Sequence, residues 1–291
     1  MGADAQGINL SYLLRTILPL AMVAGCLTLE AVPILSSSNE QQEPAGQLLQ
    51  RVVDHELQDA EQDQPLWKYD RTIKKSGHES VRRVIETRQG DLDRLISMDG
   101  KPLSNEQQEK ENKRLHSLVT DTEQAKRMQR DREQDAKRAG RLVAALPKAT
   151  ISRYGPRRGN VVELDFEPNP NFHSNSRDTE VLRAMSGTVL VDSSQKRIAQ
   201  IDGQLTKPVK FGGGLLGHLD KGGTFHVKQS EVQPGRWETI RLIVHMRGKA
   251  LLFRTVNVEE DEVRTNFEQV PDNLTLAQAA EKLNQISSAG R

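Results

Sequence analysis

The chain has 291 residues, and its 41 Lys and Arg against 40 Asp and Glu give a net charge of +1. Nucleic-acid-binding proteins usually carry a basic excess, and the aromatic residues that stack on bases make up only 4% of this sequence. The single cysteine excludes an intrachain disulfide and a cysteine-based zinc cluster. We therefore expect no nucleic-acid partner.

The N-terminal region predicts export. The uncharged apolar run Thr16–Leu29 follows a basic residue, and its length is typical of the apolar part of a signal peptide. Two processing routes remain open. Val23-Ala24-Gly25-Cys26 has the pattern of a bacterial lipobox, which would lipidate Cys26, whereas Ala31 marks a conventional cleavage site. An uncleaved signal anchor or a buried helix is the alternative. We expect residues 1–31 to be the signal and the protein to reach the periplasm or the inner leaflet of the outer membrane.

The rest of the chain is expected to form one domain behind a tether. Residues 32–45 are rich in Ser, Gln, Glu and Pro, which predicts a flexible linker, and residues 46–291 would form the domain. Ser104 and Gln107 match a capping box, which predicts that a charged helical segment over 105–145 begins there, as one or two exposed helices. Apolar residues at helical spacing predict two further helices, and these residues are Leu49, Val52, Val53, Leu57 and Ala60 in the first and Leu276, Ala280, Leu283 and Ile286 in the last.

Alternation of apolar and polar residues predicts strands in the remaining segments. Asp99-Gly100 and Arg247-Gly248-Lys249 are expected to be tight turns between strands. Short turns favour an antiparallel sheet, and a sheet of roughly ten strands must curl. We therefore predict an α+β fold in which helices cover a strongly curved antiparallel half-barrel. The predicted strands are Trp67–Ile73, Val81–Thr87, Leu92–Met98, Val162–Phe166, Thr188–Val191, Arg197–Leu205, Thr224–Lys228, Trp237–Met246 and Ala250–Val258.

Motifs for catalysis, metal binding or cofactor binding are not completed in the sequence. His55-Glu56 and His78-Glu79 begin the H-E-x-x-H pattern, but neither has the second histidine. We therefore expect no catalytic residue, no metal and no cofactor.

A glycine-rich segment, residues 210–223, matches G-x-G-x-x-G only formally. Pro208 interrupts the segment before it, and Gly222-Gly223 would break a helix after it. It has two interpretations, a glycine-rich hairpin at a sheet edge or a mobile flap over a cavity mouth. The flap would consist of Phe211, Gly212, Gly213, Gly214, Leu215 and Leu216.

The clearest strand pattern supplies a candidate ligand cavity. Leu242, Val244 and Met246 share one face of the strand, whereas Arg241 and His245 lie on the other. Burying the Arg241 face would leave a charge without solvent. The apolar face is therefore expected to line the concave interior.

The predicted architecture carries a resemblance to a known family. An exported chain with an N-terminal amphipathic helix, a strongly curved antiparallel sheet and covering helices resembles the LolA/LolB-like lipoprotein carriers and the RseB-like periplasmic regulators. Four loop and turn segments look more closely like a set of exported acidobacterial proteins of that superfamily, and they are Asp99–Ser104, Phe166–Phe172, Met185–Asp192 and Phe211–Gly217. The resemblance covers about residues 45–270 and implies a half-barrel whose apolar concave face holds acyl chains. No set of family binding residues maps onto this chain, and the charged segment 105–145 departs from the family pattern.

Two functions are therefore expected. The first is a non-enzymatic cell-envelope protein that binds a lipid, an acyl chain or a lipoprotein in the concave face of the half-barrel. The alternative is an envelope sensor or scaffold that docks a protein partner through its charged helices. A large interior cavity would favour the first function, and an interior filled by bulky side chains would favour the second.

Overall fold

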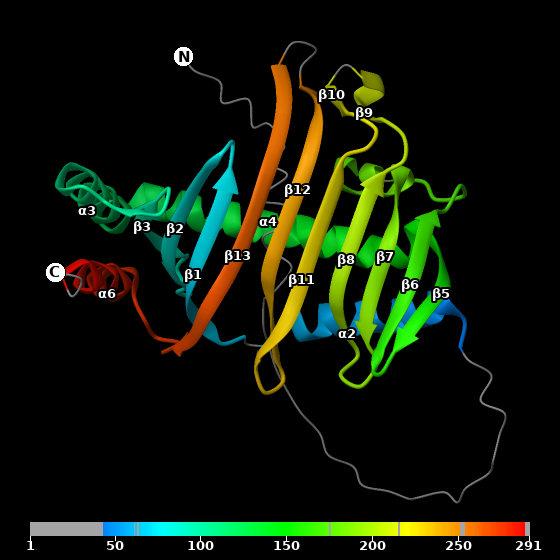
Figure 1. Cartoon of the computed structure of the whole chain (residues 1–291), viewed down its shortest axis with the longest axis horizontal. Helices are drawn as coiled ribbons and strands as arrows, with labels where there is room; N and C mark the ends of the chain where they lie inside the picture. The colour runs from blue at the N-terminus through cyan, green and yellow to red at the C-terminus, as the bar shows by residue number, and fades with distance from the viewer. Residues whose placement is uncertain are drawn as a thin grey trace, which may run out of the picture.

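A computed structural model describes residues 43–288 except 61, 63, 175, 215 and 251–253. Its centre is one open antiparallel sheet of 13 strands, strongly curved and covered by helices (Figure 1). The predicted α+β half-barrel is therefore confirmed. From edge to edge the strands are β4 (Lys101–Pro102), β3 (Leu92–Met98), β2 (His78–Ile85), β1 (Leu66–Lys75), β13 (Arg254–Val270), β12 (Arg236–Ala250), β11 (Thr224–Gln233), β8 (Arg197–Leu205), β7 (Met185–Asp192), β6 (Val161–Pro168) and β5 (Thr150–Arg158).

The sheet is not a simple meander, because its last strand lies in the middle. β13 pairs with β12 on one side and with β1 on the other, so Leu66 lies opposite Val270 and Lys75 lies opposite Glu260. The first four strands are thus attached to the others by pairing between the first and the last strand of the sequence. A small hairpin of β9 (Val209–Phe211) and β10 (Gly217–Leu219) pairs with the end of β12.

Helices α2 (Ala45–Ala60) and α4 (Thr122–Ala149) cross behind the strands in Figure 1 and form a helical layer on the concave face. The charged segment divides into α3 (Asn105–Thr120) and α4, because Asp121 ends the first helix and caps the second. The capping box of Ser104 and Gln107 is present at the start of α3, as predicted. α3 and α6 (Leu276–Ser288) pack on β3, and α5 (Arg177–Glu180) with the 3-10 turn η1 (Val181–Ala184) precedes β7.

Apolar side chains gather in two main cores. The larger core lies between the helical layer and the strands from β5 to β12, and α2 contributes Leu48, Leu49, Val52 and Val53 to it. This burial explains the spacing of three and four that predicted the helix. The second core joins Ile85 and Leu92 of the sheet to α3 and α6. Leu115 and Leu118 bury in this core, so α3 is anchored on one face while its other face is exposed.

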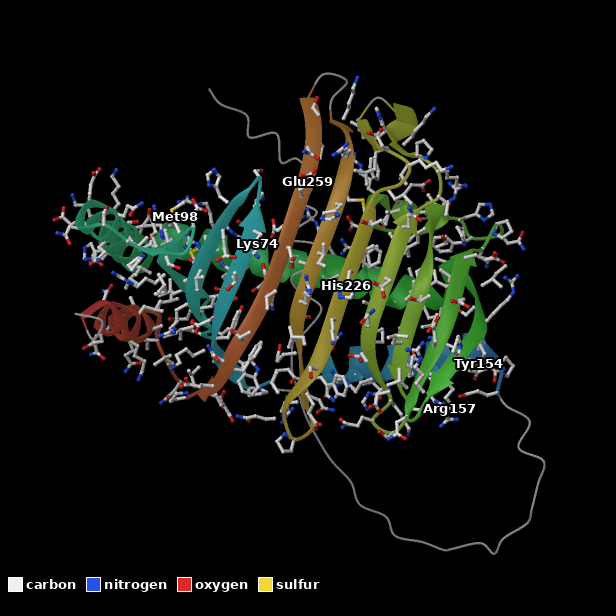
Figure 2. The ribbon with its side chains drawn as sticks, in the orientation of Figure 1. Lys74, Met98, Tyr154, Arg157, His226 and Glu259 are labelled. Carbon is white, nitrogen blue, oxygen red and sulfur yellow. The ribbon has the colours of Figure 1, made fainter. Side chains whose placement is uncertain are left out.

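The sheet face away from the helical layer is polar. Figure 2 shows side chains over this face, with His226 and Glu259 among those labelled. Polar side chains pair across neighbouring strands on this face: the His226 ring lies 2.6 Å from Asp202, and Arg247 lies 3.1 Å from Glu259. An antiparallel sheet with one packed face and one solvated face produces the alternation seen in the sequence.

One predicted turn is correct and another is wrong. Asp99 and Gly100 both have positive φ in the tight turn between β3 and β4, as this dipeptide predicts. Residues 247–249, in contrast, continue β12 and pair with β13. Gly248 serves a close approach there, because a Cβ atom on it would lie 2.1 Å from the His218 carbonyl oxygen of β10. Gly248 is therefore explained by the close approach of the β10 backbone and not by a turn.

The strand prediction also stopped too early at Val258. β13 continues to Val270 through a run of four acidic residues, Glu259–Glu262. Such a run is typical of a solvated segment, but in β13 alternate carboxylates face opposite sides of the sheet. Glu260 and Glu262 are buried on the concave side, where Arg264 donates to Glu262 at 2.7 Å.

A buried ion pair fastens α2 to the sheet. Arg197, at the start of β8, is only 3% exposed and bonds Asp59, and its Nη2 lies 3.2 Å from Glu56 Oε2. The backbone N–H of Ile198 also donates to Glu56, at 2.7 Å. Glu56 lies within the apolar stripe of α2, so the helix brings a carboxylate into the core together with its valines.

We expect Arg197→Met to lower the free energy of unfolding by about 3–5 kcal/mol, because it leaves two carboxylates without their cation. Arg241→Met is the matched control, since Arg241 pairs with Asp261 on the exposed sheet face. The control should cost less than about 1 kcal/mol. Denaturant unfolding measures both values, and equal losses would contradict the importance of the buried pair.

Candidate functional site

The three residues of the expected ligand cavity lie in the larger core. Leu242 and Val244 are 0% exposed and Met246 is 2% exposed, and they pack with residues of α2 and α4. Arg241 and His245 point to the solvated face, as the alternation predicted. The inward positions of this strand are therefore filled with side chains of the protein itself. Their role as ligand contacts stays a prediction.

The glycine-rich segment is a hairpin, one of the two interpretations of its sequence. Phe211 ends β9 and is buried in the larger core, whereas Leu216 is 39% exposed. Gly212, Gly213 and Gly214 form a turn in which all three have positive φ. Leu215 lies outside the described residues, and the flap role of the segment stays a prediction.

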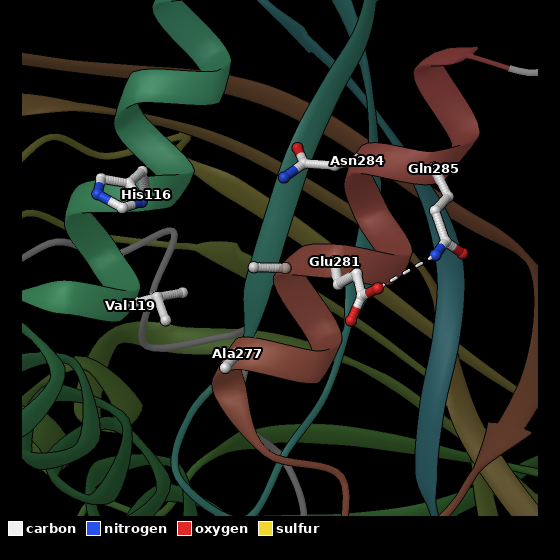
Figure 3. A pocket seen from close by; sticks show the side chains of 7 residues that line it. His116, Val119, Ala277, Glu281, Asn284 and Gln285 are labelled. Atoms are coloured by element: carbon white, nitrogen blue, oxygen red, sulfur yellow. Dashed lines mark hydrogen bonds between the residues drawn. The ribbon is translucent and has the colours of Figure 1, made fainter.

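A groove lies on the surface between α3 and α6, with a volume of about 510 Å³. Figure 3 shows His116 and Val119 of α3 facing α6 across it. The alanines and Val119 supply apolar surface, and the longer polar side chains form the rim. The α6 residues that line it are Ala277, Ala280, Glu281, Asn284 and Gln285.

The two helices are held at this separation by a buried arginine of β3. Arg94 is 2% exposed and donates to Asn284 of α6 at 2.6 Å and to Asn112 of α3 at 2.8 Å. Burial lowers the pKa of its guanidinium, and Glu111 opposes this effect. Beneath the groove, Leu115 and Leu283 are fully buried. The groove therefore lies on a packed and hydrogen-bonded base.

A second arginine cluster anchors α3 to the edge of the sheet. The Asp93 carboxylate contacts Arg71 at 2.7 Å, Arg82 at 3.0 Å and Arg114 at 3.1 Å. Burial alone would raise the pKa of Asp93, but the three cations outweigh it and lower the pKa. Glu111 of α3 accepts a hydrogen bond from the Leu95 N–H at 2.7 Å. These contacts give α3 a defined orientation beside α6.

An acidic group near the start of β12 has a pKa raised toward neutrality. Glu238 accepts a 2.6 Å hydrogen bond from the Trp67 indole N–H. Burial raises its pKa to about 7, although Arg264 and this hydrogen bond both favour the charged form. Arg264 also lies 5.5 Å from the centre of the Tyr69 ring, which stacks on Phe267. Glu238 has no part in lining the groove, and its position fits a structural role.

Sequence reasoning missed the groove and these buried charges. The signal for Glu56 was present, because it lies three residues after Val53 and four after Val52 in the apolar stripe of α2. Ala277 and Ala280 also gave a signal, since two small residues three apart leave a shallow place on a helix surface. Nothing in the sequence indicated which helix would lie beside them.

The predicted lipidation residue Cys26, the signal over residues 1–31 and most of the tether lie outside the described residues. Within the described part, no three His, Cys, Asp or Glu residues are grouped to hold a metal ion. Among the same residues, no helix has the length and apolar character required to cross a bilayer. Comparison of the chain with protein-family models, curated proteins and solved structures found no match.

The raised pKa of Glu238 predicts a stability that falls as pH rises. Between the ordinary carboxyl pKa of 4.5 and about 7, the folded state retains a proton that the unfolded state releases. Glu238→Gln keeps an acceptor for Trp67 and removes this titration. We expect the variant to exceed the wild type by on the order of 1–3 kcal/mol at pH 8 and to match it near pH 4. Unfolding measured across this pH range is the test. Glu167→Gln, on an exposed strand end, is the control and should show no comparable change.

Proposed function

We propose that this chain is a non-enzymatic cell-envelope protein that docks a protein partner in the groove between α3 and α6. The proposal rests on one observation, that the groove lies on the outer surface and not inside the half-barrel. The inward side chains of the half-barrel are packed under α2 and α4, whereas the groove is on the outer surface. Export and an envelope location remain part of the proposal and rest on the apolar run Thr16–Leu29.

The lining of the groove suits side chains of a protein better than an enclosed small molecule. Small-molecule sites usually surround most of the ligand surface. Here Ala277, Glu281 and Asn284 are exposed, and only Ala280 is buried among the α6 residues of the groove. An apolar floor with a polar rim is the arrangement found at protein interfaces. The partner would insert one or two apolar side chains from a helix or loop between His116 and Ala277.

The base of the groove supports binding without rearrangement. Arg94 joins α3 and α6 through their asparagines, and Arg114 joins α3 to Asp93 of β3. A rigid groove loses little conformational entropy when a partner binds. The charged outer side of α3 then surrounds the contact with polar residues, as the alternative function expected.

Photo-crosslinking in the native cell tests this proposal. A photoreactive residue at position 277 should form a covalent adduct with one protein, and the same residue at Lys282, exposed elsewhere on α6, should not. A probe at His116 should give the same adduct and lose it in an Ala277→Trp background, since the indole fills the groove. Adducts that do not differ between positions 277 and 282, or that survive Ala277→Trp, would contradict the proposal.

Binding of an acyl chain in the concave face is the second candidate, and one observation favours it. The apolar strand face is covered by α2, whose Leu49, Val52 and Val53 occupy the place that an acyl chain would take. Displacement of this amphipathic helix would expose a continuous apolar surface. The resemblance to lipoprotein carriers points to the same surface.

A fluorescent fatty-acid probe separates the two candidates. If the concave face binds acyl chains, the wild type should bind the probe, and a folded Val244→Trp variant should lose it because the indole fills the site. Ile243→Trp places the same indole on the opposite sheet face and should retain binding. A wild type that fails to bind the probe removes the acyl candidate and leaves the groove.

A further inference from the structure

The positive charge of this chain is concentrated on α4. The 28 residues Thr122–Ala149 contain eight Lys and Arg and four Asp and Glu, which gives 8 − 4 = +4. The whole chain has a net charge of only +1. The charge lies on the helix that crosses behind the sheet, over a large part of its width (Figure 1).

Five of the basic residues lie on one side of α4. Their spacings of three, seven, four and seven residues keep them on the same helix face. At 1.5 Å per residue, the row is about 30 Å long. We call it the basic stripe, and its members are Arg127, Arg130, Lys137, Arg141 and Lys148.

The basic stripe faces solvent. All five residues are exposed, whereas the buried residues Ala139, Val143 and Leu146 lie on the other side of the helix and pack in the larger core. The helix therefore turns its apolar side to the sheet and its basic side outward.

Acidic neighbours neutralise only part of the stripe. Arg141 pairs with Asp178 at 2.5 Å, and Arg127 lies 3.9 Å from Asp121. Arg130, Lys137 and Lys148 have no ion pair with another residue of the described chain. Three cations are thus available to a partner along the length of the helix.

We propose that the basic stripe binds the surface of a lipid bilayer that carries acidic headgroups. Long-range attraction to an anionic surface requires exposed Lys and Arg and no apolar contact. The stripe meets this requirement, because only Gln134 and small alanines lie between its members on that face and no aromatic residue occurs in α4. A protein interface would instead need a buried apolar centre.

The position of the first described residue supports a membrane as the partner. The first described residue, Glu43, lies at the α2 end of the helical layer, where the Tyr154 hydroxyl donates to its carbonyl at 2.9 Å. α2 then packs along α4. The 42 preceding residues include the apolar run that predicts export and Cys26, whose lipidation is one of the processing routes of that signal. A lipid on Cys26, or the run retained as an anchor, would attach the chain to a membrane ahead of the helical layer, which carries the stripe.

This inference goes beyond the proposed docking of a protein, because it uses a different surface. The groove is lined by α3 and α6, and none of its residues belongs to the stripe. Stripe variants should therefore retain the adduct formed from position 277. Conversely, Ala277→Trp should leave membrane binding unchanged.

The test is sedimentation of the full chain with vesicles. One set is pure phosphatidylcholine, and in the other phosphatidylglycerol makes up about a third of the lipid. The stripe variant is Arg130→Glu, Lys137→Glu and Lys148→Glu. The control is Lys207→Glu, Lys221→Glu and Lys228→Glu, which changes the net charge equally at exposed residues outside the helical layer. Thermal melting confirms that both variants fold.

We expect the wild type to bind the anionic vesicles more tightly than the neutral ones, and to lose this preference between about 50 and 200 mM salt. The affinity of the stripe variant for anionic vesicles should fall at least tenfold below that of the wild type. The affinity of the control should stay within about threefold of the wild type. Any binding by the N-terminal apolar run should occur equally in all three proteins on neutral vesicles. Equal losses in the two variants, or a wild type without preference for anionic lipid, would overturn the proposal. A wild type without preference for anionic lipid would favour an acidic protein as the partner of the stripe.

Discussion

The pairing of β1 with β13 is the contact on which the rest of the fold depends. It joins strands almost 200 residues apart and attaches the first four strands to the remainder of the sheet. The register puts Arg71 directly opposite Arg264, a pairing of like charges that is unfavourable by itself. The Arg71 side chain pairs with Asp93 and the Arg264 side chain pairs with Glu262, so each guanidinium group has its own carboxylate partner. These two acids, Glu262 fully buried and Asp93 partly buried, offset the repulsion between the two guanidinium groups.

The concave face consequently has two characters. From β5 to β12 it is apolar and packs beneath α2 and α4, whereas around β13 and β1 it is charged and hydrogen-bonded. Arg197 fastens α2 over the apolar part, because it binds Glu56 and Asp59 of that helix from the start of β8. Buried ion pairs add little stability compared with apolar packing, but they penalise wrong registers strongly. They fit a wide sheet, in which a slip of one residue would exchange the two faces.

The filled interior moves the candidate functional surfaces to the outside of the molecule. The groove at one end and the basic stripe across the helical layer use different residues of the charged segment. In the proposed arrangement, α4 would hold the domain against a membrane while α3 and α6 remain open to a protein. The composition of this segment, rich in charge and poor in large apolar residues, suits a surface that remains solvated until a partner arrives.

Local signals in the sequence determined much of the architecture. The apolar stripe of α2, the capping box at Ser104, the Asp99-Gly100 turn and the alternation around Val244 each depend on neighbours within a few residues, and the structure agrees with them. They were sufficient to predict a curved antiparallel sheet covered by helices. The alternation also predicted correctly which side of β12 is buried.

Only the tertiary structure decided the place of β13, the role of Gly248 and the location of open space. The acidic run Glu259–Glu262 forms part of a central strand because arginines lie around it in the folded chain. The local sequence pattern does not show which arginines these would be. Gly248 is required by the approach of β10, which is distant along the chain. The interior is filled by α2. The apolar spacing of α2 predicts that the helix covers an apolar surface, but it does not predict which surface. Long-range packing, and not local spacing, selects the partners of a side chain.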